Sequence, residues 1–232
     1  MDKRAQLDQS VTQADAAYTA LHEAILTCRL VPGSKITISD TAANFGFSPG
    51  AVREALSRLA AEKLTVAEAQ KGYSVAEVSS AELKDLTRTR VTIEQLCLRS
   101  AIEHGDVEWE AGIVSAYHRL HRIPLTASRR QGELNPLWSA AHTTFHAALA
   151  SGCDSPWLLT LRAMLYAQSE RYRYLSVALA HQDRDIDDEH KGIVDACLAR
   201  NGKLAAELIG RHLTLTSEIL LNSPQLHSQQ SE

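Results

Sequence analysis

Four histidines stand at spacings that can bring their side chains to one point. His142 and His146 are four residues apart, so both project from one face if their segment is helical. His190 precedes Asn201 by 11 residues, and His212 follows it by 11. If two helices fold back on each other at Asn201, both side chains stand about 16 Å from the turn, at ~1.5 Å per residue. The spacing therefore predicts a cluster of four imidazoles carried by three helices.

A cluster of imidazoles has a defined metal preference. Neutral imidazole nitrogen favours Zn, Ni, Cu or Fe over Mg or Ca. We therefore expect a divalent transition metal, Zn or Ni above the others, held by His142, His146, His190 and His212. The other six of the ten histidines show no such pattern and are interpreted as ordinary core or surface side chains.

The same quartet also admits a catalytic interpretation. Four nitrogen ligands with one open position could activate water, as in a hydrolase or an oxygen-handling helical protein. The sequence contains no His-Glu-x-x-His pattern and no evident nucleophile–base pair. Glu189, the acid nearest in sequence to a proposed ligand, should point along a different helix face from His190. A histidine-ligated metalloenzyme remains the alternative function.

Six helical segments must position these histidines. Apolar periodicity predicts helices at roughly 80–104, 107–122, 135–151, 155–178, 184–200 and 202–221. Ser155-Pro156 is typical of a helix start, and Asn201-Gly202 of a tight turn between helices. We expect an all-helical bundle over residues 80–222 and a polar tail over 223–232.

The first third of the chain has a different organisation. We expect helices at Asp15–Leu30, Ser39–Phe45 and Ser48–Lys63, followed by strands at Leu64–Val66 and Tyr73–Ala76. Ser48 caps the third helix, Pro49 takes its first position, and Val52, Leu56 and Leu59 form its buried stripe. This order is that of a winged helix-turn-helix, whose second helix enters the major groove of DNA while the hairpin approaches the minor groove.

The composition excludes several classes of protein. The 232 residues are 44% hydrophobic and 22% charged, with a formal net charge of -4, as in an ordinary globular protein. There is no apolar run long enough to span a membrane and no signal-peptide pattern at the start, so we expect a cytoplasmic protein. The four cysteines are scattered and are expected to be reduced thiols. The fold class is therefore mainly α, with no membrane partner.

Three motifs in the first third resemble the DNA-binding domain of the GntR family of bacterial transcription regulators. They are Leu30–Ser34, Phe47–Leu59 with its V-R-E-A-L-x-R-L run, and Lys71–Val75. The resemblance implies a winged helix-turn-helix domain over residues 14–79, preceded by a polar tail over 1–13. It also implies that double-stranded DNA, read as a palindromic operator by a homodimer, is the partner.

The resemblance transfers DNA contacts position by position. The family arginine of the recognition helix matches Arg53, which can grip guanine or phosphate. Arg58 is interpreted either as a phosphate contact or as a solvated charge. The expected DNA-binding set is Ser48, Gly50, Arg53, Arg58, Lys71 and Gly72. Pro49 departs from the arginine that most members carry there, which leaves the operator sequence open.

Charge weighs against this interpretation. Residues 14–79 hold six Lys/Arg and seven Asp/Glu, a weak balance for a lone DNA binder. An adaptor that uses its helix-turn-helix for protein contacts is therefore a further alternative.

Residues 80–220 resemble the FCD effector domain found in the FadR branch of the same family. The matching runs are F-H-x-A-L, E-H-x-x-I-x-x-A and R-H-L. The family's metal pattern, an Asp or Asn plus three His, matches His146, His190 and His212, with His142 in place of the acid. The resemblance implies that Arg90 receives the carboxylate of a small organic acid whose other end reaches the metal. Arg171 and Arg173 are expected to line the same cavity.

Together these features predict a DNA-binding transcription regulator that acts as a repressor and is not an enzyme. Its operator binding would be controlled by a small carboxylate, for which a dicarboxylate is the expected class.

Overall fold

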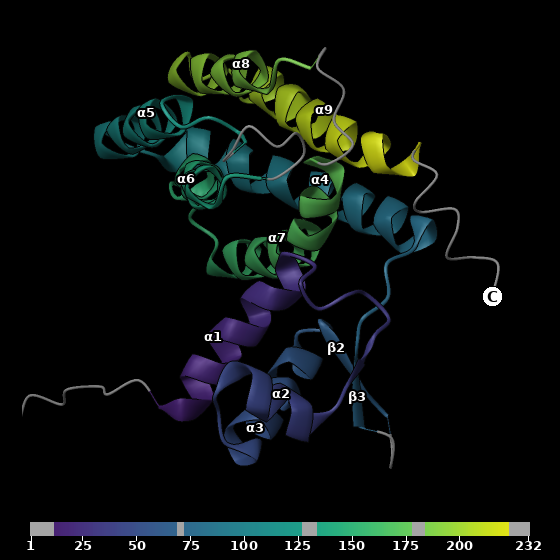
Figure 1. The fold of residues 1–232 in the computed structure, drawn as a ribbon. Coiled ribbons are helices and arrows are strands. Elements are labelled where there is room, and N and C mark those ends of the chain that lie inside the picture. The colour runs from purple at the N-terminus through teal and green to yellow at the C-terminus, as the bar shows by residue number, and fades with distance from the viewer. Residues whose placement is uncertain (1–11, 69–71, 127–133, 178–183, 223–232) are drawn as a thin grey trace, which may run out of the picture. The chain divides into compact units, whose positions relative to one another are not determined.

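A computed structural model describes residues 12–68, 72–126, 134–177 and 184–222 of the chain. It divides into two compact units, Met1–Glu77 and Val78–Glu232 (Figure 1). The described residues are mainly helical, with one small sheet, which confirms the predicted fold class. Within them, we find no helix with the length and apolar character that a bilayer crossing requires.

The first unit is a winged helix-turn-helix. Its elements are α1 (Gln13–Leu26), β1 (Lys35–Ile36), α2 (Ile38–Phe45), α3 (Pro49–Ala61), β2 (Thr65–Glu68) and β3 (Gly72–Val75). The strands form an antiparallel sheet of order β1-β3-β2, in which Thr65 pairs with Val75. The two-residue strand β1 was not predicted, because a segment this short carries no periodicity.

Local sequence explains the turn between α2 and α3. Gly46 ends α2 with a positive φ of 74°, a conformation that costs glycine little. Ser48 then accepts a hydrogen bond from the backbone of Ala51, and Pro49 occupies the first turn of α3. These residues set the angle at which α3 leaves the turn.

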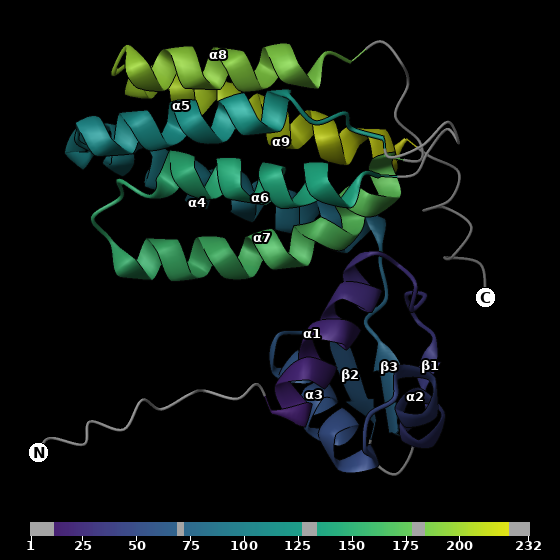
Figure 2. The same ribbon diagram turned by 60° about the vertical axis from the view of Figure 1, so that its left-hand side comes forward.

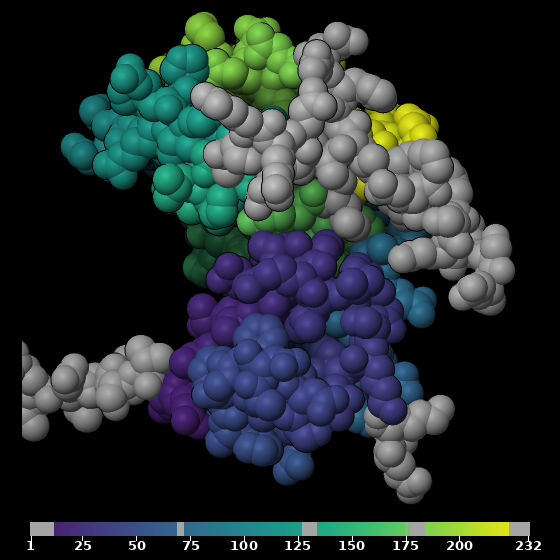
Figure 3. Space-filling view, in the orientation of Figure 1, coloured from purple at the N-terminus to yellow at the C-terminus, as the bar shows by residue number. Residues whose placement is uncertain are grey.

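The core of this unit lies between α1, α3 and the sheet. The stripe predicted for α3, Val52, Leu56 and Leu59, is fully buried. Leu21 and Ile25 of α1 pack against it. Helix α1 ends at Leu26, earlier than predicted. Figure 3 shows the side chains of this unit, in purple and blue, as one continuous surface.

The second unit contains six helices in the described residues. They are α4 (Ser80–His104), α5 (Val107–His121), α6 (Pro136–Ala150), α7 (Pro156–Val177), α8 (Ile186–Leu198) and α9 (Gly202–Leu221). From top to bottom, Figure 2 shows α8, α5, α6 and α7, and α4 packs against α6, α7 and α9. Asn201 caps α9 directly after α8 ends, so these two helices fold back on each other as the spacing predicts.

Candidate functional site

Helix α3 presents a polar flank at its N-terminal end. Arg53 is exposed and, among the described residues, makes no hydrogen bond or ion pair. Gly50 is exposed in the first turn, where open space surrounds the position of a Cβ. Ser48, at the cap, holds the end of the helix. The guanidinium of Arg53 and this helix end are therefore available to a ligand such as DNA.

The other residues that were expected to contact DNA lie in different environments. The Arg58 guanidinium donates to Asp15 of α1 at 2.8 Å and lies 4.2 Å from the centre of the Tyr18 ring. These contacts favour a role in joining α3 to α1 over a role in holding phosphate. Gly72 begins β3 with a positive φ of 96°. Lys71 lies outside the described residues.

The second unit brings the four predicted histidines together. His142 and His146 come from α6, His190 from α8 and His212 from α9. One nitrogen atom of each lies within 4.8 Å of those of the other three, and all four rings are buried. The Nε2 atoms of His142 and His146 are 3.1 Å apart, and the ring centres of His190 and His212 are 4.7 Å apart.

Burial keeps these imidazoles neutral. It lowers the pKa of all four rings, and their mutual repulsion and the nearby arginines lower the pKa of His142 and His146 further. Neutral imidazole is the form that binds a metal ion. The protonation state of the cluster therefore suits a metal ligand set.

An unsatisfied atom in the quartet tests whether a metal would fit. His190 Nε2 is buried without a hydrogen-bond partner in the structure. Such atoms are rare in a folded protein, because each costs about 1–3 kcal/mol. Two nitrogens bound to one ion at ~2.1 Å are at most ~4.2 Å apart. The His142–His146 separation of 3.1 Å lies inside that limit, and the other separations, within 4.8 Å, would need to close by at most about 0.6 Å. The donor set fits a transition metal.

Glu189 contacts the quartet from outside, through His212 of α9 and not through its sequence neighbour His190. It accepts a hydrogen bond from His212 Nδ1 at 2.7 Å. Burial raises the pKa of Glu189, but hydrogen bonds from Arg184 and His212 bring it down to about 2, so the group is a carboxylate. A carboxylate on Nδ1 fixes the ring and leaves Nε2 free to coordinate. The position of Glu189 next to His190 in the sequence indicates this carboxylate as a candidate, but it does not indicate that the group contacts His212.

A pocket in this unit borders the quartet. Its walls include two of the imidazoles, His142 and His212, and three guanidinium groups, Arg90, Arg173 and Arg184. Arg90 donates to Ser169 at 2.6 Å, and Arg173 donates to Glu170 and Ser139. Arg90 Nε and Arg173 Nη1 are nevertheless buried without a partner. Two unsatisfied guanidinium nitrogens next to imidazoles suit a carboxylate ligand.

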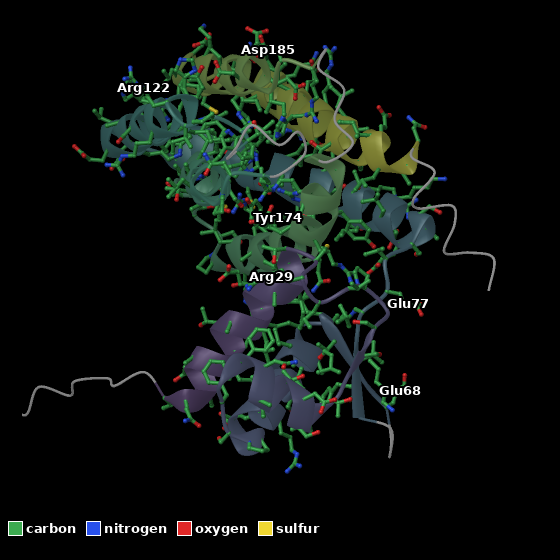
Figure 4. All side chains as sticks on the ribbon, in the orientation of Figure 1. Arg29, Glu68, Glu77, Arg122, Tyr174 and Asp185 are labelled. Carbon is green, nitrogen blue, oxygen red and sulfur yellow. The ribbon has the colours of Figure 1, made fainter. Side chains whose placement is uncertain are left out.

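The structure places Arg171 elsewhere. It pairs with Glu82 of α4 at 2.8 Å and is not among the described residues that line the pocket. The physical reason is helix geometry, since residues two apart on a helix point to nearly opposite sides. Arg173 lines the pocket, so Arg171 does not. Figure 4 marks the neighbouring Tyr174 on α7, and Asp185, which caps α8.

A buried network that the sequence did not indicate supports α6. Arg162 of α7 donates to Glu94 at 2.7 Å and to the backbone carbonyl of His146 at 2.6 Å. Glu94 also lies 3.5 Å from Arg90. Tyr166 donates to Thr143 of α6 at 3.0 Å. The pocket arginine and a histidine of the quartet are therefore connected through two buried charges.

Comparison with known families divides the chain as the structure does. Residues 85–215 match the model of the FCD domain, and residues 13–75 match that of the bacterial regulatory proteins of the gntR family. These matches cover most of both units.

Individual relatives carry related names. An HTH-type transcriptional regulator called BphR from Paraburkholderia xenovorans is 37% identical over 86% of this chain and 81% of its own length. The HTH-type transcriptional repressor GlaR of Escherichia coli is 33% identical over 88% of this chain and 93% of its own. The solved structure of E. coli McbR/YncC covers 96% of this chain and all of its own, with a TM-score of 0.73 at 17% identity, and so shows the shared fold.

Proposed function

The chain belongs to the GntR family of bacterial regulatory proteins, in the branch that carries an FCD domain, and is a DNA-binding transcription regulator rather than an enzyme. From this premise we propose that it is a cytoplasmic repressor whose hold on a palindromic operator changes when a small organic acid binds beside a metal. Its relatives are named as regulators or repressors, so the metalloenzyme and adaptor alternatives are set aside.

The exposed, unpaired guanidinium of Arg53 is the observation that supports operator reading through α3. A bidentate contact to a base is worth about 1–3 kcal/mol, so Arg53→Ala should weaken binding about 5- to 150-fold. Gel shifts with the promoter of its own gene test this. Lys203→Ala, at an exposed position of α9, is the control. Unchanged binding by Arg53→Ala would contradict the role of α3.

The quartet of His142, His146, His190 and His212 would hold the metal. A metal bound there would supply a Lewis-acidic positive charge for a carboxylate oxygen. Glu189 orients His212 by accepting a hydrogen bond from its Nδ1, and Arg162 holds the backbone at His146 by donating to its carbonyl oxygen. The ligand set therefore needs little rearrangement to coordinate.

Arg90 and Arg173 would receive the organic acid. Their unpaired nitrogens are buried beside the imidazoles, so a carboxylate would satisfy them. Coupling to DNA requires that the acid bind the two states of the regulator with different affinity. Helix α4 is the element that would transmit the change, because it carries Arg90 and begins just after the first unit ends.

We place the homodimer contact on the outer face of α7. Trp157, Leu161 and Met164 lie there at i, i+4 and i+7, with exposed fractions of 78%, 41% and 60%. The one charged residue of α7 before Glu170 is Arg162, which is buried. An apolar, uncharged face meets its own copy without like-charge repulsion, as a two-fold contact requires. The double change Trp157→Glu with Met164→Glu should give a monomer by light scattering, and an unchanged dimer would exclude this face.

A further inference from the structure

A second cavity in the helical unit reaches the quartet at His190. Its volume is about 330 Å³, and its described walls come from the end of α5, from Trp138 of α6 and from the beginning of α8. His190 is 1% exposed, and its Nε2 is buried without a hydrogen-bond partner. Within the described part of the chain, this is the one imidazole of the quartet that borders the second cavity, whereas His142 and His212 border the arginine-lined pocket.

A carboxylate and an imidazole form the mouth of this cavity. Nδ1 of His121 donates a hydrogen bond to Oδ2 of Asp187 at 2.7 Å. Both side chains reach solvent, with exposed fractions of 53% for His121 and 44% for Asp187. A carboxylate on one ring nitrogen fixes an imidazole and leaves the lone pair of the other nitrogen for a metal ion. Glu189 holds His212 in the same way, also at 2.7 Å.

The mouth lies close to the buried imidazole of His190. Asp187 and His190 are three residues apart on α8, so they project from one face with their Cβ atoms about 5–6 Å apart. The exposed fraction falls from 44% for the side chain of Asp187 to 1% for His190. Donors this close can pass an ion inward without leaving its charge desolvated and unpaired, which would be costly.

Charge and size distinguish the two cavities. The arginine-lined pocket has a volume of about 60 Å³ and three guanidinium groups, which repel a divalent cation. The wall of the larger cavity carries Asp185 and Asp187. Arg184 lies in this wall too, but its guanidinium is paired with both carboxylate oxygens of Glu189, at 2.7 and 2.6 Å. The carboxylates therefore favour cations at the mouth of the larger cavity.

Resting on the metal site proposed above, we propose that the second cavity is the entry path by which a divalent transition metal reaches the quartet. His121 and Asp187 capture the hydrated cation at the mouth, and Nε2 of His190 receives it at the inner end. The arginine-lined pocket is left to the organic acid. The metal and the acid thus approach the quartet through separate cavities.

Stopped-flow mixing of the full-length, metal-free protein with Co²⁺ tests this path, because the visible absorption of nitrogen-bound Co²⁺ reports its arrival. Asp187→Asn should lower the rate of uptake about tenfold, the low end of the gain that a cleft of one charge sign provides. Asp188→Asn removes the same charge from the same turn of α8, at an exposed position outside the described cavity wall, and is the matched control. Equal rates in the two variants, whether both fall or neither does, would overturn the entry path.

A variant that narrows the cavity gives an independent test. Ile123→Trp adds volume to the cavity wall without changing its charge. It should slow the uptake of Co²⁺ and its release to EDTA by the same factor and leave the amount bound at equilibrium unchanged, because a narrowed path alters rates and not affinity. Val114→Trp, at an exposed position of α5, is the control.

The outcomes separate the entry path from the metal site. Rates in Ile123→Trp that equal those of Val114→Trp would overturn the path and leave the proposed function standing. If the wild-type protein binds no Co²⁺ at equilibrium, the metal site and the path both fail. Full occupancy at equilibrium shows that a variant has kept its quartet, and circular dichroism establishes that it is folded.

Discussion

Metal binding should stabilise the second unit by an amount that can be estimated from the quartet. The four ligand nitrogens already lie within 4.8 Å of one another, so little reorganisation opposes binding. At a free metal concentration of about 100 times the dissociation constant, a ligand that binds only the folded state contributes about 2.7 kcal/mol. For a unit of this size, 1 kcal/mol shifts the melting temperature by about 4 °C. We therefore expect Zn²⁺ or Ni²⁺ to raise the melting temperature by roughly 10 °C.

The perturbation that tests this estimate is His146→Ala combined with His212→Ala. Each variant is melted with and without metal, so any loss of stability from the substitutions cancels from the metal-induced shift. The double variant should lose the shift, and elemental analysis should find it depleted of metal. His118→Ala, at an exposed histidine of α5, should keep both. Equal shifts and equal metal content in wild type and double variant would refute the quartet as a metal site.

Two further predictions concern the interior of the second unit. Glu94→Ala leaves the buried Arg162 without its carboxylate and should lower the free energy of unfolding by about 3–5 kcal/mol in urea titrations. Asp85→Ala, at an exposed ion pair, should change it by less than about 1 kcal/mol, and equal effects would contradict the network. Burial raises the pKa of the Cys97 and Cys197 thiols to about 12, so a thiol reagent at pH 8 should label the half-buried Cys28 first. Rapid labelling of all four thiols in the folded protein would show this account of burial to be incorrect.

The sequence predicted those parts of the site that depend on helix periodicity. The gathering of His190 and His212 follows from equal distances to one turn, because helices have a fixed rise per residue. The cap at Ser48 and the tight turn at Asn201-Gly202 follow from local sequence and were placed correctly. These features depend only on helix geometry and on hydrogen bonds between residues close in the sequence.

Features that depend on distant packing could not be predicted in this way. Arg162 and Glu94 are 68 residues apart, and no local pattern indicates that they meet. The core cluster of Leu83, Tyr172 and Leu220 is formed by side chains of three helices and has no signature in any one of them. Arg171 is a different case, because helix geometry alone places it on the opposite side of α7 from Arg173.

The four imidazoles come from α6, α8 and α9, and none comes from α4. An ion held there would link three helices directly, whereas α4 packs on the unit through apolar residues such as Leu98 and Ala101 and carries Arg90 at the pocket. In the proposed mechanism the three linked helices would form a fixed frame, and α4, which carries Arg90, would be the element that responds to the acid. Signalling in this arrangement would proceed without loss of the ion, so one metal atom can serve many cycles of ligand binding and release.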